Sequence, residues 1–358
     1  VIERMGGDKT QAVLRGGHEG AITALARHAD SRRIASASPA DAFDADDATI
    51  RVWDSGTGAM LFTATHESCG GAVSVLAFSP SGAHLLSLGQ DPEGAIRVFS
   101  LPSKSKSKST RRSADERDAD ADEDEIKVPH ATLVSVVALA ANAPVASGAW
   151  LSPDAFFVVG ADGATAYRFG GARRDDAPGT YLVSENDDEE KNTTTRLCYA
   201  FPFRFEDERG DALDPAPVCT AATALVRGGE NTKNQKHAEA FAGDSRGRVW
   251  ACGDAALASV LDADEDPTNA PARRGFVFRM LRGALEGAPL AALPRGEAAT
   301  TMSAFTDTGG RGVFVGSARR ARVLFAEHPL PVAGGASDTG TRNARYWYEL
   351  GELALDGA

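Results

Sequence analysis

Two stretches of this chain share one pattern, and that repetition constrains the fold more than any other feature. The first reads AITALARHADSRRIASAS and, after a long turn, TIRVWDSGTG. The second reads AVSVLAFSPSGAHLLSLG and then AIRVFSLPS. In both, short runs of alternating or β-branched residues are bounded by turn residues, which is typical of half-buried strands. A strand repeat of this kind predicts stacked small sheets that bury their faces against neighbours.

The two repeats align at specific residues once a longer turn, PADAFDADD, is allowed in the first. Each repeat predicts strand, turn, strand, turn and strand, and AMLFTATH adds a fourth strand to the first. The aligned pairs are Ile22 with Val73, Leu25 with Leu76, Ser36 with Ser87, Ile50 with Ile96, Val52 with Val98 and Trp53 with Phe99.

Three weaker copies follow, at residues 155–169, 238–253 and 312–328. Each has the same strand–turn–strand shape and places a glycine just after its middle strand. These glycines are Gly160, Gly243 and Gly316. Upstream, VIERM and QAVLRGG are interpreted as the last strands of a preceding unit. Five units and part of another are therefore expected.

The first repeat resembles a WD-repeat blade through Gly17-His18, Ser36, Asp47 and Trp53-Asp54. The resemblance implies that the Trp53 indole donates a hydrogen bond to Ser36 and that the imidazole bridges Ser36 and Asp47. A buried Trp and a buried His both need such partners. The second repeat keeps Ser87 but has Phe99 in place of Trp and no clear Gly-His pair, so its network is expected to be degraded.

A narrower likeness covers Gln11 to about Pro102. The run QAVLRGGHEGAITALARH, the long turn and IRVWDSGTGAML are similar to the echinoderm microtubule-associated protein-like family. The resemblance implies propellers that bind tubulin or decorate microtubules, often in cilia or on spindles. It also implies a cytoplasmic, cytoskeletal location.

The expected fold class is an all-β WD-repeat β-propeller with four-stranded antiparallel blades, incomplete in this chain. Residues 1–17 are predicted to be the last strands of a preceding blade, and residues 18–102 two well-defined blades. Residues 103–127 are predicted to be a disordered charged insertion, because their composition cannot bury enough apolar surface to fold. Residues 128–350 are predicted to be degenerate blades with long polar loops.

The composition limits the classes of partner that the chain is expected to bind. The net charge of −12 disfavours nucleic acid and anionic membranes, and repels an acidic protein unless a basic patch faces it. The apolar run at residues 133–151 is interrupted by Asn142 and Pro144, so it predicts two strands and a turn rather than a membrane span. The four cysteines are far apart and form no CxxC pair. Four reduced thiols are expected, with one disulfide as the alternative.

No enzyme, cofactor or metal motif is expected. His18, Ser36 and Asp47 resemble a catalytic set, but no GxSxG elbow surrounds the serine. The acidic runs DAFDADD and DADADEDE lack the glycine and terminal glutamate spacing of a calcium loop, so solvated loops are expected. No phosphate-binding GxxxxGK[ST] loop or HExxH occurs. A propeller enzyme would need histidines or acids recurring at one blade position, and the histidines show no such recurrence at residues 18, 66, 130 and 237.

Two clusters are candidate contacts for protein partners. A basic cluster precedes an acidic half in the charged insertion, and is interpreted as either a neutralised loop or a surface for an acidic partner such as a tubulin tail. Its members are Lys104, Lys106, Lys108, Arg111 and Arg112. The aromatic cluster Tyr346, Trp347 and Tyr348 is interpreted as a closing strand, with a partner anchor as the alternative.

The sequence thus predicts a non-catalytic interaction scaffold that binds tubulin or a microtubule-linked protein through its blades, without a small-molecule substrate. The alternatives are a WD-repeat adaptor in a ciliary or ubiquitin-related complex, and a propeller enzyme. Co-sedimentation with microtubules separates the first two.

Overall fold

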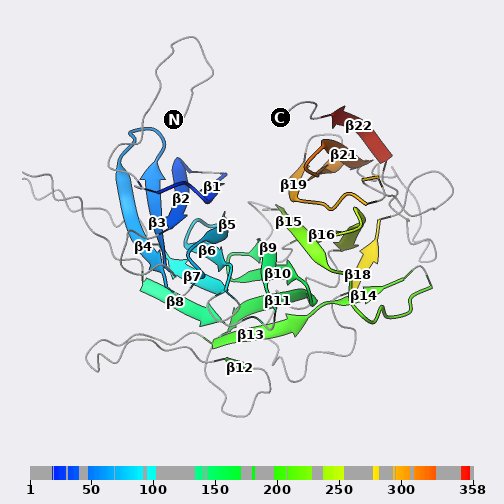
Figure 1. The fold of residues 1–358 in the computed structure, drawn as a ribbon, viewed down its shortest axis with the longest axis horizontal. Helices are drawn as coiled ribbons and strands as arrows, with labels where there is room; N and C mark the ends of the chain where they lie inside the picture. The colour runs from blue at the N-terminus through cyan, green and yellow to red at the C-terminus, as the bar shows by residue number, and fades with distance from the viewer. Residues whose placement is uncertain are drawn as a thin grey trace, which may run out of the picture. The chain divides into compact units, whose positions relative to one another are not determined.

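The computed structural model contains only β-structure in the part of the chain that it describes. The described residues are 18, 20–29, 31–39, 47–67, 69–91, 95–101, 134–139, 141, 143–170, 180–181, 197–207, 209–227, 237–253, 277–281, 293–294, 296–306, 310–327 and 348–354. The strands form five sheets (Figure 1), and the chain divides into two compact units, Val1–Ala140 and Ala141–Ala358.

The first unit contains two four-stranded antiparallel sheets, each with its strands in chain order. The first sheet consists of β1 (Ala24–Arg27), β2 (Arg33–Pro39), β3 (Ala48–Asp54) and β4 (Met60–His66). The second consists of β5 (Val73–Phe78), β6 (His84–Gly89), β7 (Ile96–Ser100) and β8 (Val134–Leu139).

Strand register in the two sheets matches the repeat alignment. Leu25 lies opposite Ser36 in the first sheet, and Leu76 lies opposite Ser87 in the second. Trp53 faces Ile34, as Phe99 faces Leu85, and both sheets have an irregularity just before these aromatic residues. Because a slip of one residue would turn every side chain to the other face, the aligned residues hold equivalent positions.

The second sheet extends past the expected boundary at residue 102. Its fourth strand, β8, comes from residues 134–139, beyond the predicted insertion at 103–127, which itself lies outside the described residues. The run at 133–151 does contain two strands, but they belong to different sheets. Closing a long loop costs only slightly more than closing a short one, so an insertion between the third and fourth strands is tolerated.

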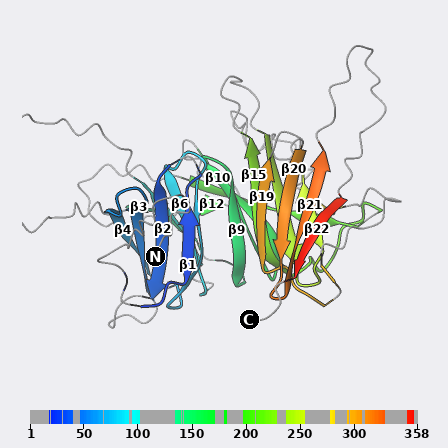
Figure 2. The same cartoon turned by 90° about the horizontal axis from the view of Figure 1, so that it is seen from above.

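The second unit contains three sheets. The third sheet has β9 (Val145–Ser152), β10 (Ala155–Gly160), β11 (Gly163–Gly170) and β13 (Leu197–Pro202). The fourth has β15 (Cys219–Arg227), β16 (His237–Asp244), β17 (Val249–Cys252) and β18 (Val277–Met280). The fifth has β19 (Thr301–Thr306), β20 (Gly310–Gly316), β21 (Arg320–Glu327) and β22 (Tyr348–Ala354), which lie side by side in Figure 2.

Two of these sheets carry a fifth strand that the repeat pattern does not predict. In the third sheet, β12 (Thr180–Tyr181) pairs with β13. In the fourth, β14 (Arg204–Glu206) pairs in parallel with β18. The β14 strand is held there by Phe205, which is buried and stacks on Phe278 at 5.1 Å, and by Glu206, which accepts hydrogen bonds from Arg279 at 3.1 and 3.2 Å.

Apolar side chains from adjacent sheets form the cores of both units. Ile50 and Val52 of the first sheet belong to one cluster with Leu76 and Phe99 of the second. In the second unit, one cluster joins the third and fourth sheets, and another joins the fourth and fifth. Each four-stranded sheet is therefore stabilised mainly by burying apolar area against a neighbour.

Glycines at the end of the second strand lie at crowded positions. Gly89, Gly160, Gly243 and Gly316 lie at or next to the end of β6, β10, β16 and β20. A Cβ at these positions would lie 2.4 to 2.6 Å from a neighbouring atom, on Cys69, Pro144, Ala299 and Thr301 respectively. At Gly89, Gly160 and Gly316 the neighbour lies on or before the first strand of the same sheet, whereas Ala299 precedes the first strand of the fifth sheet.

Replacing Gly160 by alanine should lower the free energy of unfolding by about 1–3 kcal/mol, because the new Cβ would overlap a neighbour. The clash is with the carbonyl oxygen of Pro144, a backbone atom that cannot rotate away. Urea denaturation followed by circular dichroism measures the change. Gly253→Ala is the matched control, since nothing lies within 4 Å of its Cβ position. Equal stability of the two variants would contradict the steric account.

Candidate functional site

The candidate residues of the first repeat meet on one face of the first sheet. The Trp53 indole Nε1 on β3 donates to Ser36 Oγ on β2 at 2.9 Å. His18 Nε2 lies 2.8 Å from the same oxygen, and His18 Nδ1 lies 2.6 Å from Ser38 Oγ. Ser36 and Ser38 are two residues apart on one strand, so their hydroxyls point to the same side.

Sequence reasoning missed Ser38, whose hydroxyl lies 2.6 Å from the imidazole Nδ1 of His18. Asp47 lies directly before β3, and its predicted contact with the imidazole stays a prediction. The signal was present in the sequence, because RIASAS puts a second serine on the same face of the strand.

This arrangement suits structural support better than nucleophilic catalysis. The side chain of Ser36 is buried, at 4% exposure, and its oxygen already has two partners. The serine also lies mid-strand, paired with Leu25 on one side and Arg51 on the other. A nucleophile needs access to substrate, whereas a buried Trp and His need hydrogen-bond partners.

The second repeat keeps a histidine–serine contact that the sequence did not predict, whereas Phe99 supplies no indole donor, as expected. His66, fully buried at the end of β4, has its Nδ1 2.7 Å from Ser87 Oγ. The next residue, Glu67, accepts a hydrogen bond from Arg97 at 3.1 Å. Thr65, and not glycine, precedes His66, so the Gly-His pattern does not identify this histidine.

The histidines of the two repeats reach the equivalent serines from different positions. His18 lies 18 residues before Ser36 and contacts it through Nε2, whereas His66 lies 21 residues before Ser87 and contacts it through Nδ1. Both serines are buried, so both contacts are structural.

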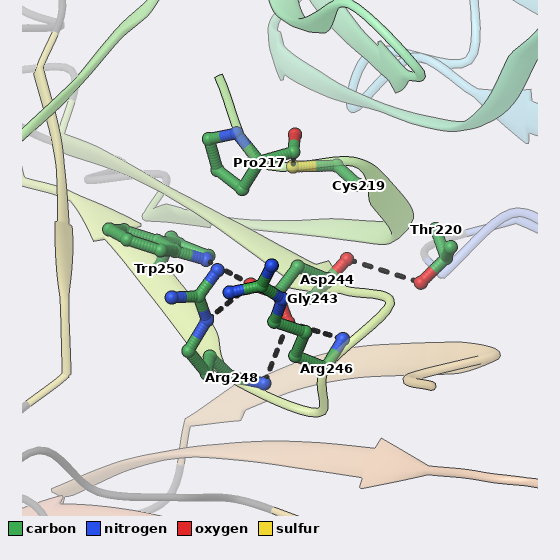
Figure 3. A network of polar contacts seen from close by, with 8 residues as sticks. All are labelled: Pro217, Cys219, Thr220, Gly243, Asp244, Arg246, Arg248 and Trp250. Carbon is green, nitrogen blue, oxygen red and sulfur yellow. Dashed lines mark hydrogen bonds and ion pairs between the residues drawn. The ribbon is translucent and has the colours of Figure 1, made fainter. Parts of the chain in front are cut away.

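A third polar network surrounds Asp244 at the turn between β16 and β17 (Figure 3). The fully buried carboxylate accepts from the backbone N–H groups of Arg246 and Arg248, both at 2.9 Å. It also accepts from Arg248 Nε at 2.6 Å and from Trp250 Nε1 at 3.1 Å. The Arg248 guanidinium lies over the Trp250 ring at 5.0 Å. These contacts fix a tight turn, because one carboxylate satisfies four donors.

Trp53 and Trp250 both end the tripeptide Arg-Val-Trp, yet they do not hold equivalent positions. Trp53 pairs with Ile34, near the start of β2, and Trp250 pairs with Ala242, near the end of β16. One indole therefore uses a serine and the other the carboxylate of a turn. The Arg-Val-Trp tripeptide alone therefore does not determine which residue its Trp pairs with, because the turns before the two tripeptides differ in length.

Three cysteines are buried free thiols: Cys69, Cys219 and Cys252. Burial raises the pKa of Cys69 to about 11 and the pKa of both Cys219 and Cys252 to about 12. The nucleophilic form of a thiol is the thiolate, so these groups are poor nucleophiles at neutral pH. They are not candidates for covalent catalysis. The side chain of Cys198 lies outside the described part.

The buried thiols should resist alkylation until the chain unfolds. At pH 8, iodoacetamide followed by peptide mass mapping is expected to label Cys69, Cys219 and Cys252 only in denaturant. Their raised pKa also means that the folded state holds these protons more tightly than the unfolded state. Stability should therefore be unaffected below about pH 8.5 and should fall as the pH rises toward 11. A Cys219→Ala and Cys252→Ala double variant should lose part of that dependence. Rapid native labelling of any of the three would contradict the burial.

Other predicted contacts fall outside the described residues. They are the basic cluster Lys104, Lys106, Lys108, Arg111 and Arg112, the acidic runs, and the side chains of Tyr346, Trp347 and Tyr348. Over the part that the structure does describe, no three His, Cys, Asp or Glu side chains gather in a way that could hold a metal ion. Within that same part, no helix has the length and apolar character to cross a membrane.

Comparison with known proteins finds one family and several solved structures. The family described as WD domain, G-beta repeat matches residues 9–54. No curated protein matches the chain by sequence. The β-propeller domain of Cps50 (Swd1) from Myceliophteria thermophila is similar at 13% identity and a TM-score of 0.49, over 94% of this chain and 73% of that one.

A second similar structure is Sqt1 from Chaetomium thermophilum, bound to the N-terminus of the ribosomal protein L10. It is 12% identical with a TM-score of 0.43, over 87% of this chain and 62% of that one. The matched repeat spans β1, β2 and β3, the strands that carry Ser36 and Trp53. The described residues thus form an all-β fold of mainly four-stranded antiparallel sheets, as expected for the blades of a β-propeller, and one of the repeats matches a WD domain over residues 9–54.

Proposed function

We propose that this chain is a non-catalytic protein-interaction scaffold, and that its partner is tubulin or a microtubule-linked protein. WD-repeat blades offer loops and strand faces on a rigid support, which suits binding of protein partners. The proposed location is the cytoplasm, on the cytoskeleton, including the cilium or spindle.

The scaffold role is supported by the structural contacts of the residues that resemble a catalytic set. The hydroxyl of Ser36 and the two ring nitrogens of His18 are occupied by partners within one sheet. The three described thiols are buried and protonated. The polar groups most suited to chemistry in these blades therefore support the fold.

The choice of a microtubule partner is supported by the sequence likeness over Gln11 to about Pro102. Tubulin tails are acidic, and the chain itself has a net charge of −12. Binding therefore requires locally basic surface, because like charges repel at long range. The proposed contact in the charged insertion is the basic cluster defined above.

Co-sedimentation with taxol-stabilised microtubules tests this function at low and at moderate salt. The intact chain is expected to pellet at both, and a variant with the basic cluster changed to glutamine should pellet less. Arg246→Gln is the matched control, since Arg246 is exposed on a turn of another sheet. Absence of pelleting by a folded, monodisperse sample would overturn the microtubule partner and favour an adaptor with another partner.

A further inference from the structure

One arginine at the turn between β16 and β17 is fixed in place and still reaches solvent (Figure 3). The Nε of Arg248 donates to the Asp244 carboxylate at 2.6 Å, and the guanidinium lies over the Trp250 ring at 5.0 Å. The Asp244 side chain is 1% exposed, whereas the Arg248 side chain is 29% exposed. The guanidinium is therefore held at its Nε and on one face, while part of it remains open.

The terminal amino groups of Arg248 are the open part. Nη1 and Nη2 have no hydrogen-bond partner among the residues that the structure describes, and neither is a buried atom. A guanidinium binds a carboxylate best through two parallel N–H···O bonds, which need two donors on one edge. Because the contacts to Asp244 and Trp250 already restrict the side chain, less conformational entropy is lost when such a pair forms.

The charge of the turn favours an anion. Residues 244–248 read Asp-Ser-Arg-Gly-Arg, so two guanidinium groups stand against one carboxylate, although the whole chain has a net charge of −12. Salt screens charges that lie more than about 10 Å away, so these nearby groups matter most to a bound ion. The second arginine, Arg246, is exposed, and its contact in the described part is a backbone N–H bond to Asp244. It adds charge to the turn but is not held in one orientation.

We propose that Arg248 anchors a carboxylate of a protein partner, presented by an acidic segment that reaches the turn between β16 and β17. Nη1 and Nη2 donate to the two carboxylate oxygens, while Nε stays on Asp244. A nucleic acid is disfavoured as the partner, because its many phosphates are repelled by a chain with a net charge of −12. The inference rests on the proposed scaffold function, and it names a contact residue and the chemistry that the residue binds.

The first test uses the intact chain and a fluorescein-labelled glutamate-rich peptide, followed by fluorescence anisotropy at moderate salt. Arg248→Gln should weaken binding by about tenfold or more, as loss of a charge-assisted hydrogen bond does. Arg248→Lys keeps the charge but loses the two parallel donors, so it should also weaken binding. The matched control Arg246→Gln removes the same charge from the same turn and should change the affinity by less than about twofold. A peptide with glutamine in place of glutamate should not bind.

A second measurement needs no variant, and so it covers the case in which an Arg248 variant fails to fold. The Nε–H of Arg248 is bonded to the buried Asp244 carboxylate, which protects its proton from exchange with water. Nuclear magnetic resonance of the intact chain with isotope-labelled arginine should therefore detect this signal, and its proximity to the Trp250 ring identifies it. The glutamate peptide should shift the signal, and the glutamine peptide should not.

The proposal is overturned if the glutamate peptide does not bind or leaves the Nε–H signal unshifted, or if the glutamine peptide binds equally well. It is also overturned if folded Arg248→Gln or Arg248→Lys binds like the parent chain, or if Arg246→Gln weakens binding as much as Arg248→Gln. Arg248 would then serve the turn alone. Microtubule pelleting reports on the proposed function separately. Peptide binding through Arg248 without pelleting would overturn the tubulin partner and leave the carboxylate site in place, whereas pelleting without peptide binding would overturn the site alone.

Discussion

Replacing Glu239 by alanine should lower the free energy of unfolding by about 3–5 kcal/mol, because it leaves a buried guanidinium without its carboxylate. Glu239 on β16 accepts from Arg311 Nη1 on β20 at 2.6 Å, and the two side chains are only 9% and 5% exposed. The pair joins the fourth and fifth sheets beside their shared apolar cluster. Guanidinium chloride unfolding measures the loss.

A double variant separates the pair from the packing around it. Changing both Glu239 and Arg311 to leucine removes both buried charges, so its stability should return close to that of the parent chain. The pair of Arg279 and Glu206 is the comparison: Glu206 is buried but Arg279 is 68% exposed, so Arg279→Ala should cost less than Glu239→Ala. A small effect of Glu239→Ala alone would contradict the account of a buried, uncompensated charge.

Trp53→Ala should also cost about 3–5 kcal/mol, as loss of a fully buried aromatic side chain does. Trp53 is 2% exposed, and its indole N–H donates to Ser36. The alanine variant loses both the packing of the indole ring and the hydrogen bond to Ser36. Thermal and urea unfolding followed by circular dichroism give the change in stability.

Trp53→Phe is the graded comparison. Phenylalanine occupies the equivalent position in the second repeat, where Phe99 is 1% exposed. The ring is therefore accommodated at such a site, and only the hydrogen bond and some volume are lost, at about 1–2 kcal/mol. If Trp53→Ala were as stable as the parent chain, the network would not support the sheet.

The fold of the first unit was predictable because two copies of one pattern lie close together in the sequence. Alignment of Ser36 with Ser87 and of Trp53 with Phe99 fixed the strand register, which the structure confirms. The weaker copies were located through their glycines, which the close approach of a neighbouring segment requires. Alternating apolar residues and a glycine at a crowded position are both local features, so they can be recognised in the sequence.

The contacts that sequence missed depend on distance in space. β14 joins β18 although more than 70 residues separate them, and no pattern within β14 marks that pairing. The role of His66 was missed because Thr65, and not glycine, precedes it, and because it reaches Ser87 from the last strand of the preceding sheet. The ion pair between Glu239 and Arg311 likewise depends on how two sheets stack, which periodicity does not encode.

The residues His18, Ser36 and Trp53 should stabilise the first sheet as one hydrogen-bond network. A double-mutant cycle with Ser36→Ala and Trp53→Phe tests this through the free energy of unfolding of the two single variants and the double variant. We expect a coupling free energy of about 0.5–3 kcal/mol, as for residues in one hydrogen-bond network. Effects that add to within about 0.3–0.5 kcal/mol would show that the two side chains act independently and would rule the network out.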